Sequence, residues 1–176
     1  MKKMSKLSGI LKLPENIEAG KGTYDAQLLT SFGEIPLKLS EHLITKFTNG
    51  DSVLVKGYLA VDFIKAHLFT YVHVRSITPY LEDDEVNEMH VYGTLTKKVE
   101  LVTCEQPEND YAVAIIYAAN NKEANSGIIH VYLKGELART ATEIEVRSPV
   151  EVVGRLSKKR ALSVIASTIT ERRSEV

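Results

Sequence analysis

The stretch GDSVLVKGYL, Gly50 to Leu59, returns later in the chain as RSPVEVVGRL, Arg147 to Leu156. In both stretches apolar residues alternate with other residues, and a glycine with a leucine two positions later ends the run. Such alternation indicates a β-strand with one buried face. Because the register is the same in both stretches, the sequence predicts two tandem copies of one unit. The residue after the glycine is Tyr58 in one copy and Arg155 in the other, and either side chain can stack on a nucleic acid base.

Matched elements flank this strand in each copy. Each copy opens with a strand that has glycine at its third position, followed by a strand that begins with tyrosine, a short third strand and a helix. The expected ranges are Leu7–Lys12, Tyr24–Leu29, Ile35–Leu39 and Glu41–Phe47 in the first copy, and Val91–Thr96, Tyr111–Ile116, Ile128–Leu133 and Gly135–Glu145 in the second. Ser40 is a suitable N-cap for the first helix. Tyr24 and Tyr111 occupy similar places, and we expect both rings to pack at the barrel ends.

After the repeated strand, the first copy continues into an expected antiparallel hairpin. Its even positions, among them Ile64, Leu68 and Val72, are apolar and are expected to face the core. Its odd positions place rings and cations together on the outer face: Phe63, Lys65, Phe69, Tyr71 and Arg75. The second copy has a shorter hairpin with the basic tip Lys158, Lys159 and Arg160, which is either a solvated turn or a phosphate contact.

Three strands, a helix and two strands form the element order of the OB-fold, a five-stranded Greek-key barrel. We therefore expect an all-β protein with one short helix per repeat, built as two tandem OB-fold five-stranded Greek-key barrels. Residues 1–80 are assigned to the first OB-fold and residues 89–176 to the second. Residues 81–88, LEDDEVNE, are acidic and lack apolar periodicity, which is typical of a linker.

Composition excludes several classes of protein. The net charge is −1, so a nucleic-acid site would have to be a localised basic groove. The single cysteine leaves no disulfide framework, and no apolar run approaches the roughly 18 residues of a membrane helix. We expect a cytoplasmic protein that makes no membrane contact. The five histidines lack metal-ligand spacing, and no paired acid and base residues suggest catalysis, so we expect neither a cofactor nor an enzyme.

The helix and fourth strand of each copy carry a more specific pattern. Gly135-Glu-Leu-Ala138 leads through the second helix to Pro149-Val-Glu-Val-Val-Gly-Arg-Leu156, and the first copy has Gly50-Asp-Ser-Val-Leu-Val-Lys-Gly-Tyr-Leu59. This pattern resembles bacterial single-stranded DNA-binding proteins, in which a Gly-Lys-Leu-Ala strand end and a helix precede a Gly-Asp-x-Val-x-Val-x-Gly-Arg-Leu strand. The chain departs from that family in lacking tryptophan and in holding two copies. The resemblance implies two oligonucleotide-binding barrels, and the family's usual four barrels imply a homodimer.

Candidate nucleic-acid-binding residues are rings and cations at positions expected to face outward. They are Lys12, Lys56, Tyr58, Phe63, Lys65, Phe69, Tyr71, Arg75, Tyr92, Tyr132, Arg155, Lys158, Lys159 and Arg160. In this assignment the first copy supplies mostly rings and the second mostly cations. The alternative for Phe69 and Tyr71 is packing against the other copy or a partner chain.

The sequence thus predicts largely sequence-independent binding of single-stranded DNA, in replication, recombination or transfer of a genetic element. Replication or recombination proteins are expected as further partners. Two alternatives stay open at this point, because OB-folds host many functions. One is a protein-protein assembly module of a primosome-like complex, and the other is single-stranded RNA binding.

Overall fold

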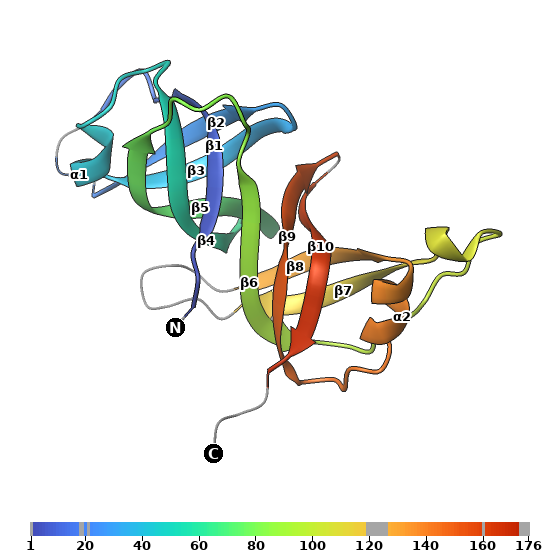
Figure 1. Ribbon diagram of the computed structural model, residues 1–176. Coiled ribbons are helices and arrows are strands. Elements are labelled where there is room, and N and C mark those ends of the chain that lie inside the picture. Colours follow the sequence, from blue (N-terminus) through green and yellow to red (C-terminus); the bar gives the residue numbers. More distant parts are fainter. Residues whose placement is uncertain (1, 18–19, 21, 119–126, 160, 173–176) are drawn as a thin grey trace.

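The first half of the chain is a closed five-stranded barrel (Figure 1). The structure, a computed structural model, describes residues 2–17, 20, 22–118, 127–159 and 161–172. The elements of the first barrel are β1 (Ser5–Lys12), β2 (Thr23–Thr30), β3 (Gly33–Ser40), α1 (Glu41–Ile44), β4 (Ser52–Ile64) and β5 (His67–Pro79). Its strand order is β2-β3-β5-β4-β1, the β1–β2 pairing closes it, and β3 and β5 are parallel.

The second half repeats this topology. Its elements are β6 (Asn87–Leu95), the 3-10 helix η1 (Pro107–Asn109), β7 (Tyr111–Ala118), β8 (Gly127–Lys134), α2 (Glu136–Ala141), β9 (Pro149–Lys158) and β10 (Leu162–Glu171). The order β6-β7-β8-β10-β9 is closed by the β6–β9 pairing, and β8 and β10 are parallel. The predicted fold, two tandem OB-fold barrels with one short α-helix each, is confirmed.

Both α-helices are shorter than predicted. Ser40 caps α1 as expected, with its hydroxyl accepting a hydrogen bond from the Leu43 amide at 3.4 Å. The helix ends at Ile44, three positions before Phe47: the Lys46 amide donates to the Leu43 carbonyl oxygen, only three residues back, and the Thr48 amide donates to the Asp51 side chain. The second helix ends at Ala141.

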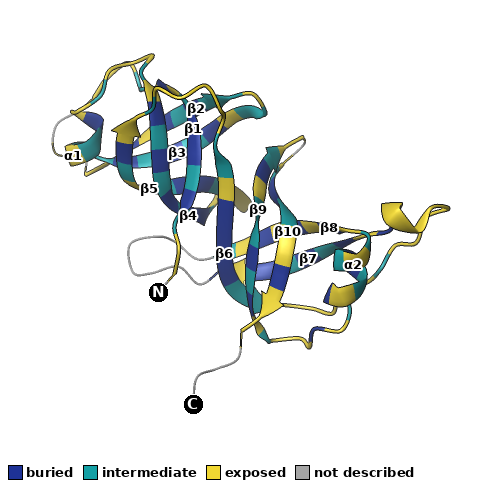
Figure 2. Cartoon of the chain, in the orientation of Figure 1, coloured by how far each residue is buried: buried dark blue, intermediate teal, exposed yellow. Residues whose placement is uncertain are grey.

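Alternating apolar residues fill each barrel, as the dark bands on the strands show (Figure 2). The glycine of the repeated strand is required by packing of the backbone. A Cβ atom on Gly57 would lie 2.0 Å from the carbonyl oxygen of His73, and one on Gly154 would lie 2.1 Å from that of Ile165. At both places the strand pairing shifts register, as in a β-bulge. The repeated glycine therefore allows β4 and β9 to approach their neighbours closely.

The two barrels are joined through their first strands. Lys6 and Leu7 of β1 pair antiparallel with Glu88 and Asn87 of β6. The Asn87 side chain also donates to the carbonyl oxygen of Leu156 at 2.9 Å and accepts from the Leu156 amide at 2.7 Å. The pairing makes one continuous ten-stranded sheet from two closed barrels.

Each barrel also extends an arm to the other. The β4–β5 hairpin of the first barrel reaches β8, where Gly127 faces Val61 so closely that a Cβ atom would lie 2.6 Å from the Val61 side chain. The β9–β10 hairpin reaches back to β3, where the Lys158 ammonium donates to the Glu34 carbonyl oxygen at 2.5 Å. Because β8 and β3 are equivalent strands, the two barrels are related as in an isologous, two-fold dimer.

The segment between the barrels is partly exposed. Residues 81–85 are exposed, whereas Asn87 and Glu88 lie within β6. Glu85 accepts hydrogen bonds from the Ser31 amide at 2.9 Å and from its hydroxyl at 2.5 Å. Within the described residues, no helix has the length and apolar character that crossing a membrane requires.

Limited proteolysis with a protease specific for acidic residues should cut at Glu82 to Asp84, because these residues are exposed. The two fragments should nevertheless elute together in native size-exclusion chromatography, because the β1–β6 pairing and both arms hold the barrels together. Separate elution of two barrel-sized fragments would contradict this arrangement.

Candidate nucleic-acid interface

A groove of about 850 Å³ crosses the outer face of the second barrel. Its floor and walls come from the start of β7, from β8, from the β9–β10 hairpin and from two residues of the first barrel's arm, Leu68 and Thr70. In an OB-fold, the face of strands 2 and 3 and the loop between strands 4 and 5 commonly bind oligonucleotides. Strands β7 and β8 and the β9–β10 hairpin are these same elements in the second barrel. The groove therefore lies where the topology favours binding.

The alternation of side chains along β8 places the groove residues on the outer face of the barrel. In β8, Ile129, Val131 and Leu133 are buried in the barrel. The intervening side chains face out of the barrel and line the groove; they are Ile128, His130, Tyr132 and Lys134. Tyr132 and Tyr111 are each 44% exposed, so both rings are open to a ligand.

Cations stand beside these rings. Arg155 of β9 and Lys159 of the following hairpin are exposed and line the same groove. An exposed ring offers a stacking platform for a base, and a neighbouring cation attracts the phosphate backbone. The groove thus combines the two kinds of group that single-stranded nucleic acid needs.

A network at one end of the groove holds the loop that carries Asn109 and Tyr111. The buried Asp110 accepts a hydrogen bond from the Cys104 amide at 2.8 Å and forms an ion pair with Arg139 of α2 at 2.9 Å. The same guanidinium donates to the carbonyl oxygen of Pro107 at 3.1 Å. These contacts tie η1 to α2 and so fix the two groove residues on either side of Asp110.

The corresponding face of the first barrel is filled by its own side chains. Lys38 of β3 forms an ion pair with Asp62 of β4, and its ammonium lies 4.5 Å from the centre of the Tyr71 ring. Tyr71 donates a hydrogen bond to Asp62 at 3.4 Å, and Phe69 stacks on Tyr71 with the two ring centres 6.2 Å apart. Burial alone would lower the pKa of Lys38, but the hydrogen bond and negative charge of Asp62 outweigh it and raise the pKa.

One ring predicted for the first barrel is therefore misassigned. Tyr71 does face outward, but it is only 2% exposed under Phe69, Lys38 and Asp62, so its prediction as a stacking residue is wrong. Phe63 is 72% exposed and Phe69 40% exposed at the end of the arm.

The prediction that the even-numbered residues of this hairpin face the core is also wrong at the tip of the arm. Ile64 and Leu68 are exposed, because the arm extends beyond the barrel wall. The tip is a two-residue turn in which Lys65 and Ala66 both have positive φ, as hairpin turns with the strand twist require. Lys65 and Arg75 are exposed.

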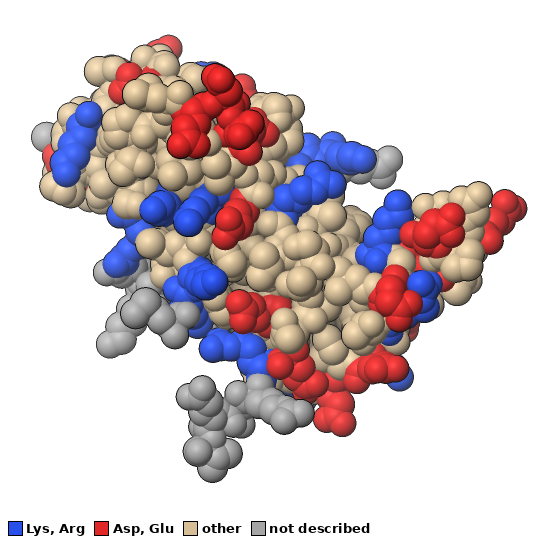
Figure 3. All heavy atoms as spheres, in the orientation of Figure 1, with Lys and Arg blue, Asp and Glu red and all other residues tan. Residues whose placement is uncertain are grey.

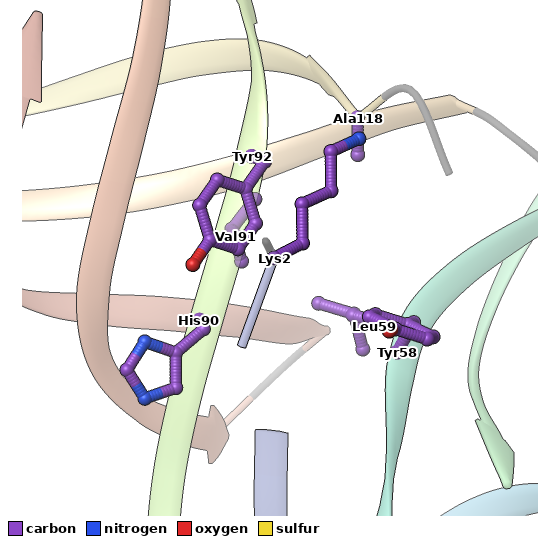
Figure 4. A pocket seen from close by; sticks show the side chains of 7 residues that line it. All are labelled: Lys2, Tyr58, Leu59, His90, Val91, Tyr92 and Ala118. Carbon is purple, nitrogen blue, oxygen red and sulfur yellow. The ribbon is translucent and has the colours of Figure 1, made fainter. Parts of the chain in front are cut away.

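Two other predicted rings meet at the junction of the barrels. Tyr58 and Tyr92 line a small cavity of about 40 Å³, and Figure 4 shows the Lys2 side chain running between them. Tyr92 is 8% exposed, its hydroxyl accepts a hydrogen bond from the Lys3 amide at 2.9 Å, and Arg172 lies 5.1 Å from its ring centre. The prediction that Tyr92 is an open outward ring is wrong, because cations of both termini cover it.

The remaining predicted cations lie in different places. Lys12, at the end of β1, is exposed, and Lys56 in β4 is half-buried; neither lines the groove. Lys158 is exposed but binds the first barrel through the Glu34 carbonyl oxygen. Arg160 lies outside the described residues.

Sequence reasoning missed Tyr111, which was expected to pack at a barrel end like Tyr24. The registers show the reason: Tyr24 pairs with Leu39, whereas it is Ala112 that pairs with the equivalent Leu133. Tyr111 is thus one position earlier than Tyr24 in its strand, and one position changes the face. The signal was present, since Ala112, Ala114 and Ile116 form the apolar alternation of β7.

Charge is distributed unevenly over the surface. In the view of Figure 3, Lys and Arg gather where the barrels meet, while Asp and Glu gather on the first barrel and at the far end of the second. Among the residues that the structure describes, no group of three or more His, Cys, Asp or Glu could hold a metal ion.

Solved structures show the same two-barrel architecture. A deletion mutant of the single-stranded DNA binding protein from Thermus aquaticus has a TM-score of 0.77 and 20% identity over 99% of this chain and 96% of its own. The wild-type protein from the same organism gives a TM-score of 0.75 and 20% identity over 99% and 94%. At this identity the likeness shows the fold. No protein-family model matches the chain, and no curated protein matches its sequence.

Arg139→Ala should lower the free energy of unfolding by about 1–3 kcal/mol, because it leaves the buried Asp110 carboxylate without its cation. Glu136→Ala is the matched control, because it removes the other carboxylate that pairs with Arg139. The Glu136 side chain is 83% exposed, so its loss should change the free energy of unfolding by less than about 0.5 kcal/mol. Urea unfolding of both variants measures the difference. Equal stability of the two variants would show that the Asp110 network does not hold the loop.

Proposed function

We propose that this chain binds single-stranded DNA, largely independently of sequence, in the groove across the second barrel. The observation that carries the proposal is the position of Tyr111 and Tyr132 beside Arg155 and Lys159, on the outer face of β7 and β8 and on the β9–β10 hairpin. The two Thermus aquaticus structures of the same architecture are named as single-stranded DNA binding proteins, which supports this choice of ligand. Replication, recombination or transfer of DNA are the processes that such binding would serve.

The path continues from the groove onto the arm of the first barrel. Leu68 and Thr70 of β5 already line the groove, and the exposed ring of Phe63 pairs with Leu68 and so lies on the same face of the arm. Phe69 lies on the opposite face, with Asp62 and Tyr71. Bases leaving the second barrel would meet an apolar, ring-bearing surface with the exposed Lys65 at its tip. In this proposal the arm adds stacking, and the second barrel supplies both stacking and charge.

The same exposed tip supports a second candidate, an assembly module that contacts protein. Phe63, Ile64 and Leu68 are 72%, 51% and 57% exposed, which is unusual for apolar side chains of this size gathered at one place. A replication or recombination protein, or a second copy of this chain, could cover them. Sedimentation of wild type and Phe63→Ala distinguishes the candidates: a change in assembly with unchanged DNA affinity favours the module.

Tyr132→Ala and Tyr111→Ala should each weaken binding of labelled oligo-dT by about 1–3 kcal/mol, the value of one lost stack. Fluorescence anisotropy at fixed salt measures this. Tyr80→Ala is the control, because this tyrosine lies outside the groove and its loss should leave affinity unchanged. Full affinity in both folded groove variants would exclude the groove as the DNA site. The same titration with oligo-rU compares the two sugars.

Arg155→Ala and Lys159→Ala should each flatten the plot of log affinity against log salt by about 0.7, the slope contributed by one phosphate contact to a single strand. Lys46→Ala removes an exposed charge of the first barrel outside the groove and should leave the slope unchanged. An equal slope for Lys46→Ala and Arg155→Ala would show that the overall charge, rather than the groove, attracts the DNA.

A further inference from the structure

The two barrels carry opposite chemistry at matching positions of their strand faces. Leu37 of β3 and Val131 of β8 are equivalent, because each pairs with the parallel fifth strand of its barrel. The next residue along is Lys38 in the first barrel and Tyr132 in the second. The position that offers an open ring in the second barrel therefore holds an ammonium in the first.

The partner of that ammonium is also replaced. Gly57 and Gly154 occupy the same close approach in β4 and β9, so the residue five positions later is Asp62 in one barrel and Lys159 in the other. Lys159 is exposed and lines the groove. The Asp62 side chain is only 12% exposed and binds Lys38.

A second acidic residue lies beside this pair. Asp25 lies directly opposite Lys38 across β2 and β3, whereas Val113 lies opposite Tyr132 across β7 and β8. Asp25 is exposed, and its negative charge adds to that of Asp62 at Lys38. A phosphate approaching Lys38 would thus meet two carboxylates, one of which already occupies the ammonium.

Rings cover the pair from the remaining side. Tyr71 is buried against Asp62 and Lys38, and Phe69 stacks on Tyr71. The ring that could have served as a base platform is consequently held inside the protein. The equivalent residue beside Val164 in β10 is Ser163, which lines the open groove.

We propose that Asp62 closes the strand face of the first barrel to nucleic acid, by occupying the Lys38 ammonium of that face as a phosphate would. The chain then offers one complete binding face and one arm, instead of two equivalent faces. This inference rests on the proposed function and specifies which part of the chain the DNA contacts.

Asp62→Asn tests the proposal, since it keeps the size of the side chain and removes the charge that holds Lys38. Titration of poly-dT should show that each variant chain occludes a longer stretch than wild type, by a length between about 4 and 16 nucleotides for an added OB face. The salt dependence on a long oligo-dT should steepen by about 0.7 for each additional phosphate that the variant binds. Asp83→Asn is the matched control, because it makes the same charge change at an exposed position between the barrels.

Two further measurements keep the outcomes separate. If Asp62→Asn does not fold by circular dichroism, Asp62→Ala, which also removes the carboxylate that holds Lys38, carries the test. A folded Asp62→Asn or Asp62→Ala that matches Asp83→Asn in occluded length and salt slope overturns the proposal. An oligo-dT of about 10 nucleotides is short enough for one barrel, so its binding reports on the second barrel alone. Failure of the wild-type protein to bind this oligonucleotide would refute the proposed function instead.

Discussion

The arrangement of the two barrels depends on a short antiparallel contact between their first strands. Lys6 and Leu7 of β1 pair with β6, and the contact is reinforced where the Ser8 hydroxyl accepts from the Val86 amide at 2.7 Å and where Asn87 binds both backbone groups of Leu156. Closing a barrel pairs its edge strands with each other, so little free edge is left for a second barrel to share. This pairing and the contacts of the two β-hairpin arms together hold the barrels against each other.

Each arm carries residues of one barrel onto the surface of the other. The first barrel's arm crosses to β8, which brings Leu68 and Thr70 into the wall of the second barrel's groove. The reciprocal arm places Lys158 on β3, where its ammonium satisfies a backbone carbonyl of the first barrel. Lys158, which the sequence left as either a solvated turn residue or a phosphate contact, thus holds the barrels together, while the adjacent Lys159 is exposed and lines the groove.

Most of the fold, and less of the site, could be predicted from the sequence. Alternation in the repeated strand and the order of elements determine the barrel topology, because burying one face of each strand leaves few arrangements. The exposure of an outward side chain depends instead on which other side chains cover it. The alternation of apolar residues carries no information about that. Tyr71 and Tyr92 are outward residues that other side chains cover, and Tyr111 was assigned to the wrong face through a register error of one residue.

Joining the two copies in one chain allows the strand faces of the two barrels to carry different residues. In an isologous dimer of a single barrel, both faces carry the same residues, and a substitution in one appears in the other. Here the same pseudo-two-fold geometry holds Asp62 at one site and Lys159 at its counterpart. A net charge of −1 is compatible with a localised basic groove, because no acidic residue among those that the structure describes lines the groove and acids such as Asp25 and Asp62 lie on the strand face of the first barrel. If the strand binds in the groove as proposed, this asymmetry would give it one preferred face on each chain, which two identical faces in a dimer would not.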